Sequence, residues 1–173
     1  MSAGASVVQV PETLDAWRMV AARRQFEGRM PLSAMPRLGD SLADTDGECR
    51  FALEFGHDAL QVPYVELTLD AGLPLVCQRS LERFVFPVKT VQRLGLIRDE
   101  AEDAALPPGY EALLVPEDGL LRPTELVEDE LVLALPVVPM APGSEPVEQT
   151  WSAGEEELQA ASPFAALAAL KKK

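Results

Sequence analysis

Hydrophobic and polar residues alternate most clearly between Gly47 and Gly56. Every second position from Cys49 to Phe55 is apolar, and most of the positions between them are charged. A period of two is typical of a strand with one buried face. Shorter runs of the same kind predict further strands at 26–30, 60–69, 73–79 and 83–89.

Short connections between these runs favour antiparallel neighbours. The chain is therefore predicted to be α+β, with a mainly antiparallel sheet built as an open or partly curled meander of about four strands and packed with a few helices. Pro63 favours an edge or a bulge near the start of the 60–69 strand. Residues 31–38 fit no single element.

Helical spacing appears in two further segments of the chain. Residues 12–24 carry apolar positions at Leu14, Trp17, Val20 and Ala21. A second helix is predicted from Pro123, a residue favoured at the first helical position, to Leu135 before Pro136. Residues 99–119, between the last predicted strand and this second helix, are turn-rich, and they predict a long surface connection. In the second helix the spacing predicts a core stripe of Val127, Leu131, Ala134 and Leu135, with Glu125, Glu128, Asp129 and Val132 on the opposite side.

The end of the chain changes in composition. Residues 1–138 are predicted to form one domain, and residues 139–161, rich in Pro, Gly, Ser and Glu, a flexible acidic linker. Residues 162–173 predict a short amphipathic helix, with Ser162 as N-cap and three final lysines where the helix dipole favours cations. Phe164, Leu167 and Leu170 share one face. A helix this short is marginal alone, so it must dock on its own domain or on a partner.

Charge is distributed unevenly along the chain, whose net charge is −13. Residues 1–98 carry 11 basic and 12 acidic side chains, whereas residues 99–160 carry one basic and 16 acidic ones. An acidic chain repels a phosphate backbone unless its cations are gathered in a patch. The C-terminal half instead suits basic partners. No apolar stretch long enough for a membrane span and no signal peptide is found, so a cytoplasmic protein is expected.

Residues capable of catalysis or metal binding are few. His57, the only histidine, is expected in an exposed turn without a nucleophile beside it. Nucleotide-binding, metalloprotease and nucleophile-elbow motifs are missing, so hydrolase, kinase and dehydrogenase functions have no sequence support. No enzyme activity, cofactor or metal site is predicted. Cys77-Gln78-Arg79-Ser80 lacks the second cysteine of a zinc or redox pair. A buried free thiol with a structural role is therefore predicted for Cys77.

Short motifs follow one another in a characteristic order: Pro11-x-Thr13-Leu14-Asp15, Phe26-x-Gly28, Cys77-x-Arg79 with Phe84, Leu106-Pro107, Tyr110-Glu111, Val127-Glu128-Asp129-Glu130, Leu133 to Pro139, and Pro163-Phe164-Ala165-x-Leu167-x-x-Leu170-Lys171. This ordered set resembles the YceD family, the large-ribosomal-RNA-subunit accumulation proteins of bacteria, with relatives in plastids. The resemblance covers residues 10–173. It implies a non-enzymatic role in the accumulation of 23S ribosomal RNA, hence in ribosome biogenesis. The family usually has a second cysteine where this chain has Ser80.

Three hypotheses follow for how such a protein acts. In the first, it binds a basic ribosomal or RNA-processing protein through an acidic helix face and the end of the chain: Glu125, Glu128, Asp129, Phe164, Leu167 and Leu170. In the second, it binds ribosomal RNA directly through Arg18, Arg23, Arg24, Arg29 and Arg79, with Arg50 and Arg83 as possible additions from the sheet. The third, a nuclease that uses carboxylates and a divalent ion, rests only on the abundance of Asp and Glu.

Overall fold

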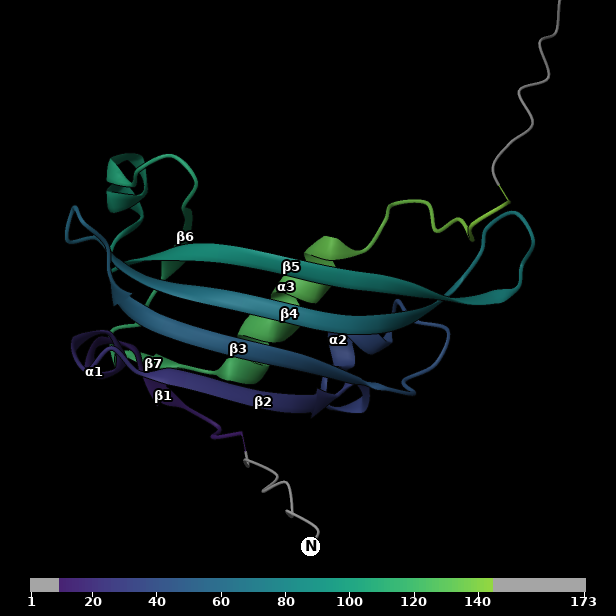
Figure 1. Ribbon diagram of the computed structural model, residues 1–173, viewed down its shortest axis with the longest axis horizontal. Helices are drawn as coiled ribbons and strands as arrows, with labels where there is room; N and C mark the ends of the chain where they lie inside the picture. Colours follow the sequence, from purple (N-terminus) through teal and green to yellow (C-terminus); the bar gives the residue numbers. More distant parts are fainter. Residues whose placement is uncertain (1–9, 145–173) are drawn as a thin grey trace, which may run out of the picture.

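A five-stranded open sheet forms the body of the protein (Figure 1). The structure is a computed structural model, and it describes residues 10–144. The strands are β1 (Leu14–Asp15), β2 (Gln25–Pro31), β3 (Glu48–His57), β4 (Pro63–Val76), β5 (Arg83–Ile97), β6 (Glu111–Leu114) and β7 (Leu120–Leu121). The helices are α1 (Ala16–Ala21), α2 (Pro36–Gly39), α3 (Pro123–Ala134) and the 3₁₀ turns η1 (Leu32–Ala34) and η2 (Glu100–Ala105).

The sheet has the order β2-β3-β4-β5-β6. The first four strands are antiparallel to their neighbours, β6 runs parallel to β5, and β1 pairs with β7 outside the main sheet. The prediction of an α+β fold with a mainly antiparallel meander is therefore confirmed.

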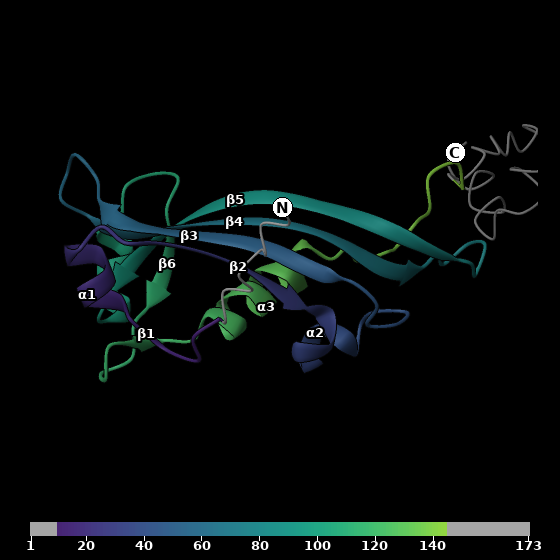
Figure 2. The ribbon, with the colours of Figure 1, turned by 60° about the horizontal axis from the view of Figure 1, so that its bottom comes forward.

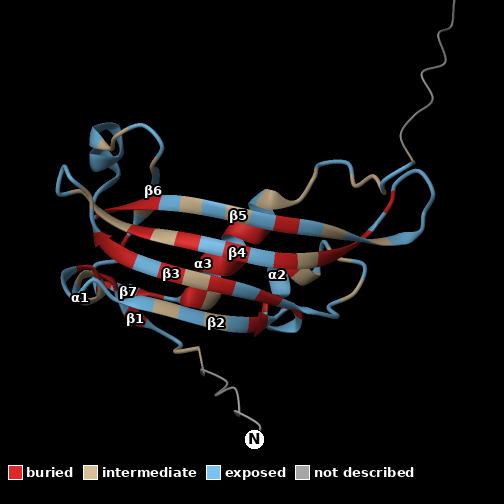
Figure 3. Cartoon of the chain, viewed as in Figure 1, coloured by how far each residue is buried: buried red, intermediate tan, exposed pale blue. Residues whose placement is uncertain are grey.

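The helices α2 and α3 lie on the same face of the sheet, and no helix formed by residues 10–144 lies on the opposite face (Figure 2). Buried and exposed residues alternate along the strands, as Figure 3 shows most clearly on β3. The core lies between sheet and helices, where Leu53, Leu67, Val127 and Leu131 are almost completely buried. This one-sided packing leaves the outer face of the sheet to charged residues.

The strand β4 is longer than predicted. The runs 60–69 and 73–79 were expected to be separate strands, but β4 continues through Gly72 to Val76. A glycine is required here because a β-carbon at residue 72 would come within 2.8 Å of Val85 Cγ1 on β5. Close packing, not a turn, therefore accounts for the glycine.

The first helix is shorter than predicted. Instead of a helix over 12–24, Leu14 and Asp15 pair with β7, and Asp15 then caps α1 by accepting a hydrogen bond from Arg18 N at 3.0 Å. The second helix agrees with prediction, since α3 begins at Pro123 and ends at Ala134. The 99–119 connection holds η2 and β6, which were not predicted.

The chain beyond α3 is described as far as Ser144. The predicted linker begins at residue 139, yet the carbonyl of Pro139 accepts a hydrogen bond from Gln78 N at 2.9 Å. Most of that linker and the predicted helix at 162–173, with Phe164, Leu167 and Leu170, lie outside the described residues.

Candidate functional site

The predicted acidic face of α3 is partly internal. Glu128 was expected to be exposed, and this is wrong, because its side chain is only 5% exposed. Its Oε1 accepts hydrogen bonds from the backbone N of Arg37 at 2.7 Å and of Leu38 at 3.1 Å. Its Oε2 lies 3.1 Å from Arg37 Nη2. Glu128 therefore holds the start of α2 against α3 and is removed from the proposed partner-binding surface.

The two other acidic residues of this face are exposed but ion-paired. Asp129 lies 2.7 Å from Arg37 Nη2, and Glu125 lies 3.2 Å from Arg122 Nη1. Hydrogen bonds donated to Asp129 and Glu128 raise the pKa of Arg37. Since both carboxylates already have a cation beside them, this face attracts a basic partner less than its composition implies.

Glu130 is the second buried acidic residue of α3, with 7% of its surface exposed. Burial, together with the negative charges of Glu111 and Asp129, raises the pKa of its carboxyl group. No ion pair reaches it within the described part of the chain. Its charge is therefore unfavourable to the fold at neutral pH.

We expect Glu130→Gln to stabilise the protein at pH 7. Because the pKa is higher in the folded than in the unfolded chain, stability is lost as pH rises through the folded pKa. Glutamine carries no charge at any pH, so it avoids this loss of stability. Its advantage over glutamate should disappear below about pH 4, where the carboxyl group is protonated in both the folded and the unfolded chain. Thermal unfolding at both pH values, with exposed Glu117→Gln as control, measures this. A variant less stable at pH 7 would contradict it.

The arginines fall into two groups. Arg29, Arg37, Arg83, Arg93 and Arg122 each form an ion pair with a carboxylate. Within residues 10–144, the exposed residues Arg18, Arg23, Arg24, Arg50 and Arg98 form none. Of the residues predicted to contact RNA, Arg18, Arg23 and Arg24, and Arg50 as a possible addition, have no carboxylate partner among residues 10–144. Arg29, by contrast, is paired with Glu48 at 3.2 Å. Arg79 donates to the carbonyl of Ser144 at 3.1 Å.

Four of the arginines without an ion pair belong to one end of the molecule. Arg18 is in α1, and Arg23 and Arg24 come just after the end of that helix at Ala21. Arg98 comes from the end of β5, and its guanidinium lies 4.4 Å above the ring of Trp17 in α1. We call these four residues the arginine end. Arg98 was not predicted, because only the fold brings the end of β5 beside α1.

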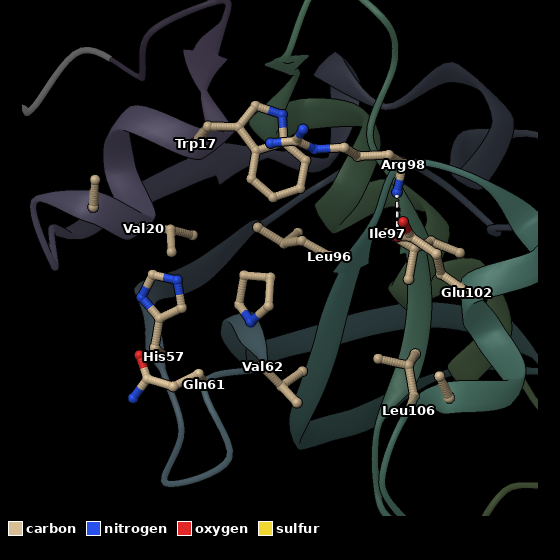
Figure 4. A pocket seen from close by; sticks show the side chains of 13 residues that line it. Trp17, Val20, His57, Gln61, Val62, Leu96, Ile97, Arg98, Glu102 and Leu106 are labelled. Atoms are coloured by element: carbon tan, nitrogen blue, oxygen red, sulfur yellow. Dashed lines mark hydrogen bonds between the residues drawn. The ribbon is translucent and has the colours of Figure 1, made fainter.

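A groove of about 680 Å³ lies beside the arginine end (Figure 4). It is bounded by α1, the β3–β4 turn, the end of β5 and η2, and Trp17 and Arg98 lie together at one side of it. His57 is exposed at its rim, as predicted, but it is the last residue of β3 and pairs with Pro63, whereas it was expected in the turn. The apolar lining comes mainly from Val20, Val62, Leu96, Ile97 and Leu106.

A polar network on the outside of the sheet was missed by the sequence analysis. The hydroxyl of Tyr110 donates to Asp58 at 2.8 Å, and Asp58 also accepts hydrogen bonds from Leu60 N and Val62 N. Arg93 lies 4.9 Å above the ring of Tyr64 and pairs with Glu66. These contacts fix the β3–β4 turn that forms one side of the groove. Tyr110 belongs to a recognised motif, but its partner is 52 residues away in sequence.

The thiol of Cys77 is free and fully buried, as predicted, while its structural role stays a prediction. Its sulfur lies 3.3 Å from Ser144 Oγ and 3.5 Å from Ser80 N. Hydrogen bonds from the backbone of Ala141, then from Ser144 and Ser80, lower the pKa of this thiol to about 6. Cys77 thereby fastens residues 139–144 to the β4–β5 turn. In the described residues, no three His, Cys, Asp or Glu side chains gather as a metal site would require.

Comparison with known proteins gives one consistent result. The family model described as large ribosomal RNA subunit accumulation protein YceD matches residues 65–171. A relative of that name from Haemophilus influenzae is 30% identical over 173 residues, with 96% of this chain and 98% of the relative covered. No solved structure matches, and no helix among the described residues is long and apolar enough to cross a membrane. The chain belongs to the YceD family of large ribosomal RNA subunit accumulation proteins.

Proposed function

We propose that this protein is a non-enzymatic, cytoplasmic factor in ribosome biogenesis, needed for the accumulation of large-subunit (23S) ribosomal RNA. We further propose that it contacts this RNA directly through the arginine end. The family's description, which names RNA accumulation and not a reaction, supports the first statement. The second is carried by the gathering of Arg18, Arg23, Arg24 and Arg98 at one end, where none of them has a carboxylate partner among residues 10–144.

The pairing of each cation decides how well it can bind phosphate. An arginine already in an ion pair must lose that partner before it neutralises a phosphate, whereas an unpaired one releases only solvent and counterions. Arg98 also stacks on Trp17, and an arginine plane next to an aromatic ring is a common surface for unpaired bases. The arginine end therefore meets the requirement for an acidic protein to bind RNA, namely a local gathering of cations.

A basic protein partner is the second candidate function. The exposed acids of η2 and its N-cap, Asp99, Glu100, Glu102 and Asp103, support it because none of them forms an ion pair in the described part of the chain. Glu125 and Asp129 support it less, since each has an arginine partner. A pull-down from cells with and without ribonuclease separates the candidates. Partners that survive the nuclease would favour a protein contact.

The triple variant Arg18→Gln, Arg23→Gln and Arg24→Gln is expected to weaken RNA binding and its salt dependence. Each phosphate contact to single-stranded RNA contributes about 0.7 to the slope of log K against log salt, so three contacts should reduce the slope by about 2. Fluorescence anisotropy with transcribed fragments of 23S RNA, between low and physiological salt, measures the slope on the full chain.

The matched control is Arg83→Gln, Arg93→Gln and Arg122→Gln, which removes the same charge from arginines that have carboxylate partners. It should leave the slope nearly unchanged. Equal losses in the two triple variants would show that only total charge matters. Wild-type binding without salt dependence would overturn direct phosphate contact altogether.

A further inference from the structure

We propose that the groove between α1 and η2 is the docking site of this chain's own C-terminal segment, Pro163 to Lys173. This inference does not rest on the proposed RNA contact, but the two sites adjoin, because Trp17 and Arg98 of the arginine end also line the groove. The groove suits an apolar segment because its lining is mostly apolar and no described residue fills it. Val20, Leu96 and Ile97 are buried beneath it, while Trp17 and Val62 are only half-buried. Covering Trp17 and Val62 would remove their remaining apolar surface from water, which stabilises the bound state.

The segment has the apolar residues that such a groove requires. Phe164, Leu167 and Leu170 recur every three residues, with alanines between them. On a helix this spacing gives one apolar stripe, the pattern by which helices bind in hydrophobic grooves. The segment is too short for a stable helix in water by itself. Docking in a groove would provide the missing stabilisation.

Charge complementarity orients the segment. Lys171, Lys172 and Lys173 follow the apolar stripe directly. One side of the groove is formed by η2, and the residues Asp99, Glu100, Glu102 and Asp103 are exposed there. Within residues 10–144 these carboxylates form no ion pair. With the apolar stripe in the groove, the three lysines would lie against η2.

The chain is long enough to reach the groove. Ser144 is held beside Cys77, just after the end of β4, and the groove is lined by Pro63 at the start of β4. The distance to cover is the length of that 14-residue strand, about 46 Å. The 19 residues from 145 to 163 span up to about 63 Å when extended. The segment can therefore occupy the groove of its own molecule.

Zero-length crosslinking with a carbodiimide tests this on the full chain. The reagent joins an amine to a carboxylate only where the two are in contact, and mass spectrometry identifies the pair. We expect links from Lys171–Lys173 to the carboxylates of η2 and its N-cap. The pair Lys89 and Asp70, 3.9 Å apart on the outer face of the sheet, serves as an internal positive control. Mixing isotope-labelled with unlabelled protein distinguishes links within a chain from links between chains.

The variant Phe164→Asp with Leu167→Asp should reduce these links at least about tenfold, because it removes the apolar burial that holds the segment. The matched control, Ala165→Asp with Ala169→Asp, adds the same charge away from the stripe and should retain most of them. A second measurement uses Trp151→Phe, which leaves Trp17 as the only tryptophan. Trp17 emission should shift to the red in the Phe164 and Leu167 variant.

Three results would overturn the proposal. Links that join labelled to unlabelled chains at the frequency expected for random pairing would show that the segment binds a second copy. Formation of the Lys89 link without any η2 link would show that the groove is empty of the segment. Equal loss in both double variants, with unchanged Trp17 emission, would show that charge alone brings the lysines near η2.

Discussion

Replacing Glu128 with alanine is expected to lower the free energy of unfolding by about 3 kcal/mol. The carboxylate accepts the backbone N–H groups of Arg37 and Leu38 and pairs with the Arg37 guanidinium. Leu38 is itself fully buried, so the N–H left behind has no access to water. An orphaned buried donor costs its full desolvation. Urea denaturation followed by circular dichroism measures the loss.

The control for this prediction is Asp129→Asn on the same helix. Asp129 pairs with the same arginine, but its side chain is 54% exposed. Exposed ion pairs contribute about 0–1 kcal/mol, so this variant should lose little. A similar loss of unfolding free energy in the two variants would contradict a structural role for Glu128. Glu128 would then behave like an exposed acidic residue.

Replacing Leu131 with alanine is expected to cost about 3 kcal/mol, through lost burial and the cavity left behind. Leu131 is completely buried where α3 packs against the sheet. Leu133, two residues further along the same helix, is 74% exposed. Leu133→Ala removes the same atoms from a position in water, so its effect should stay within about 0.5 kcal/mol. Thermal and urea unfolding of both variants measure the two losses of stability. Equal losses would contradict the packing of α3 against the sheet.

Local patterns predicted the elements of the fold that depend on local physics. The alternation from Cys49 to Phe55 predicted β3 nearly to its ends, and Pro123 marked the start of α3. The continuity of β4 was missed because Gly72 resembles a turn residue in sequence, whereas in the structure it makes room for Val85. Such a reason becomes visible only once two strands are side by side.

The candidate site could be predicted only in part, for the same reason. Arg18, Arg23 and Arg24 are close in sequence and were found, but Arg98 joins them only through its contact with Trp17. Glu128 has the helical position of a partly exposed residue, and its partners lie 90 and 91 residues away in sequence. Helical spacing describes which side of a helix a residue occupies, but not which other elements cover that side.

The most direct test of the account is the level of 23S ribosomal RNA in bacteria that lack their own family member and carry this protein instead. Wild-type protein and the Arg83, Arg93 and Arg122 control should restore the ratio of 23S to 16S RNA. The Arg18, Arg23 and Arg24 variant should fail to restore it at equal protein abundance, checked by immunoblot. Full restoration by that variant would contradict the claim that the arginine end carries the function.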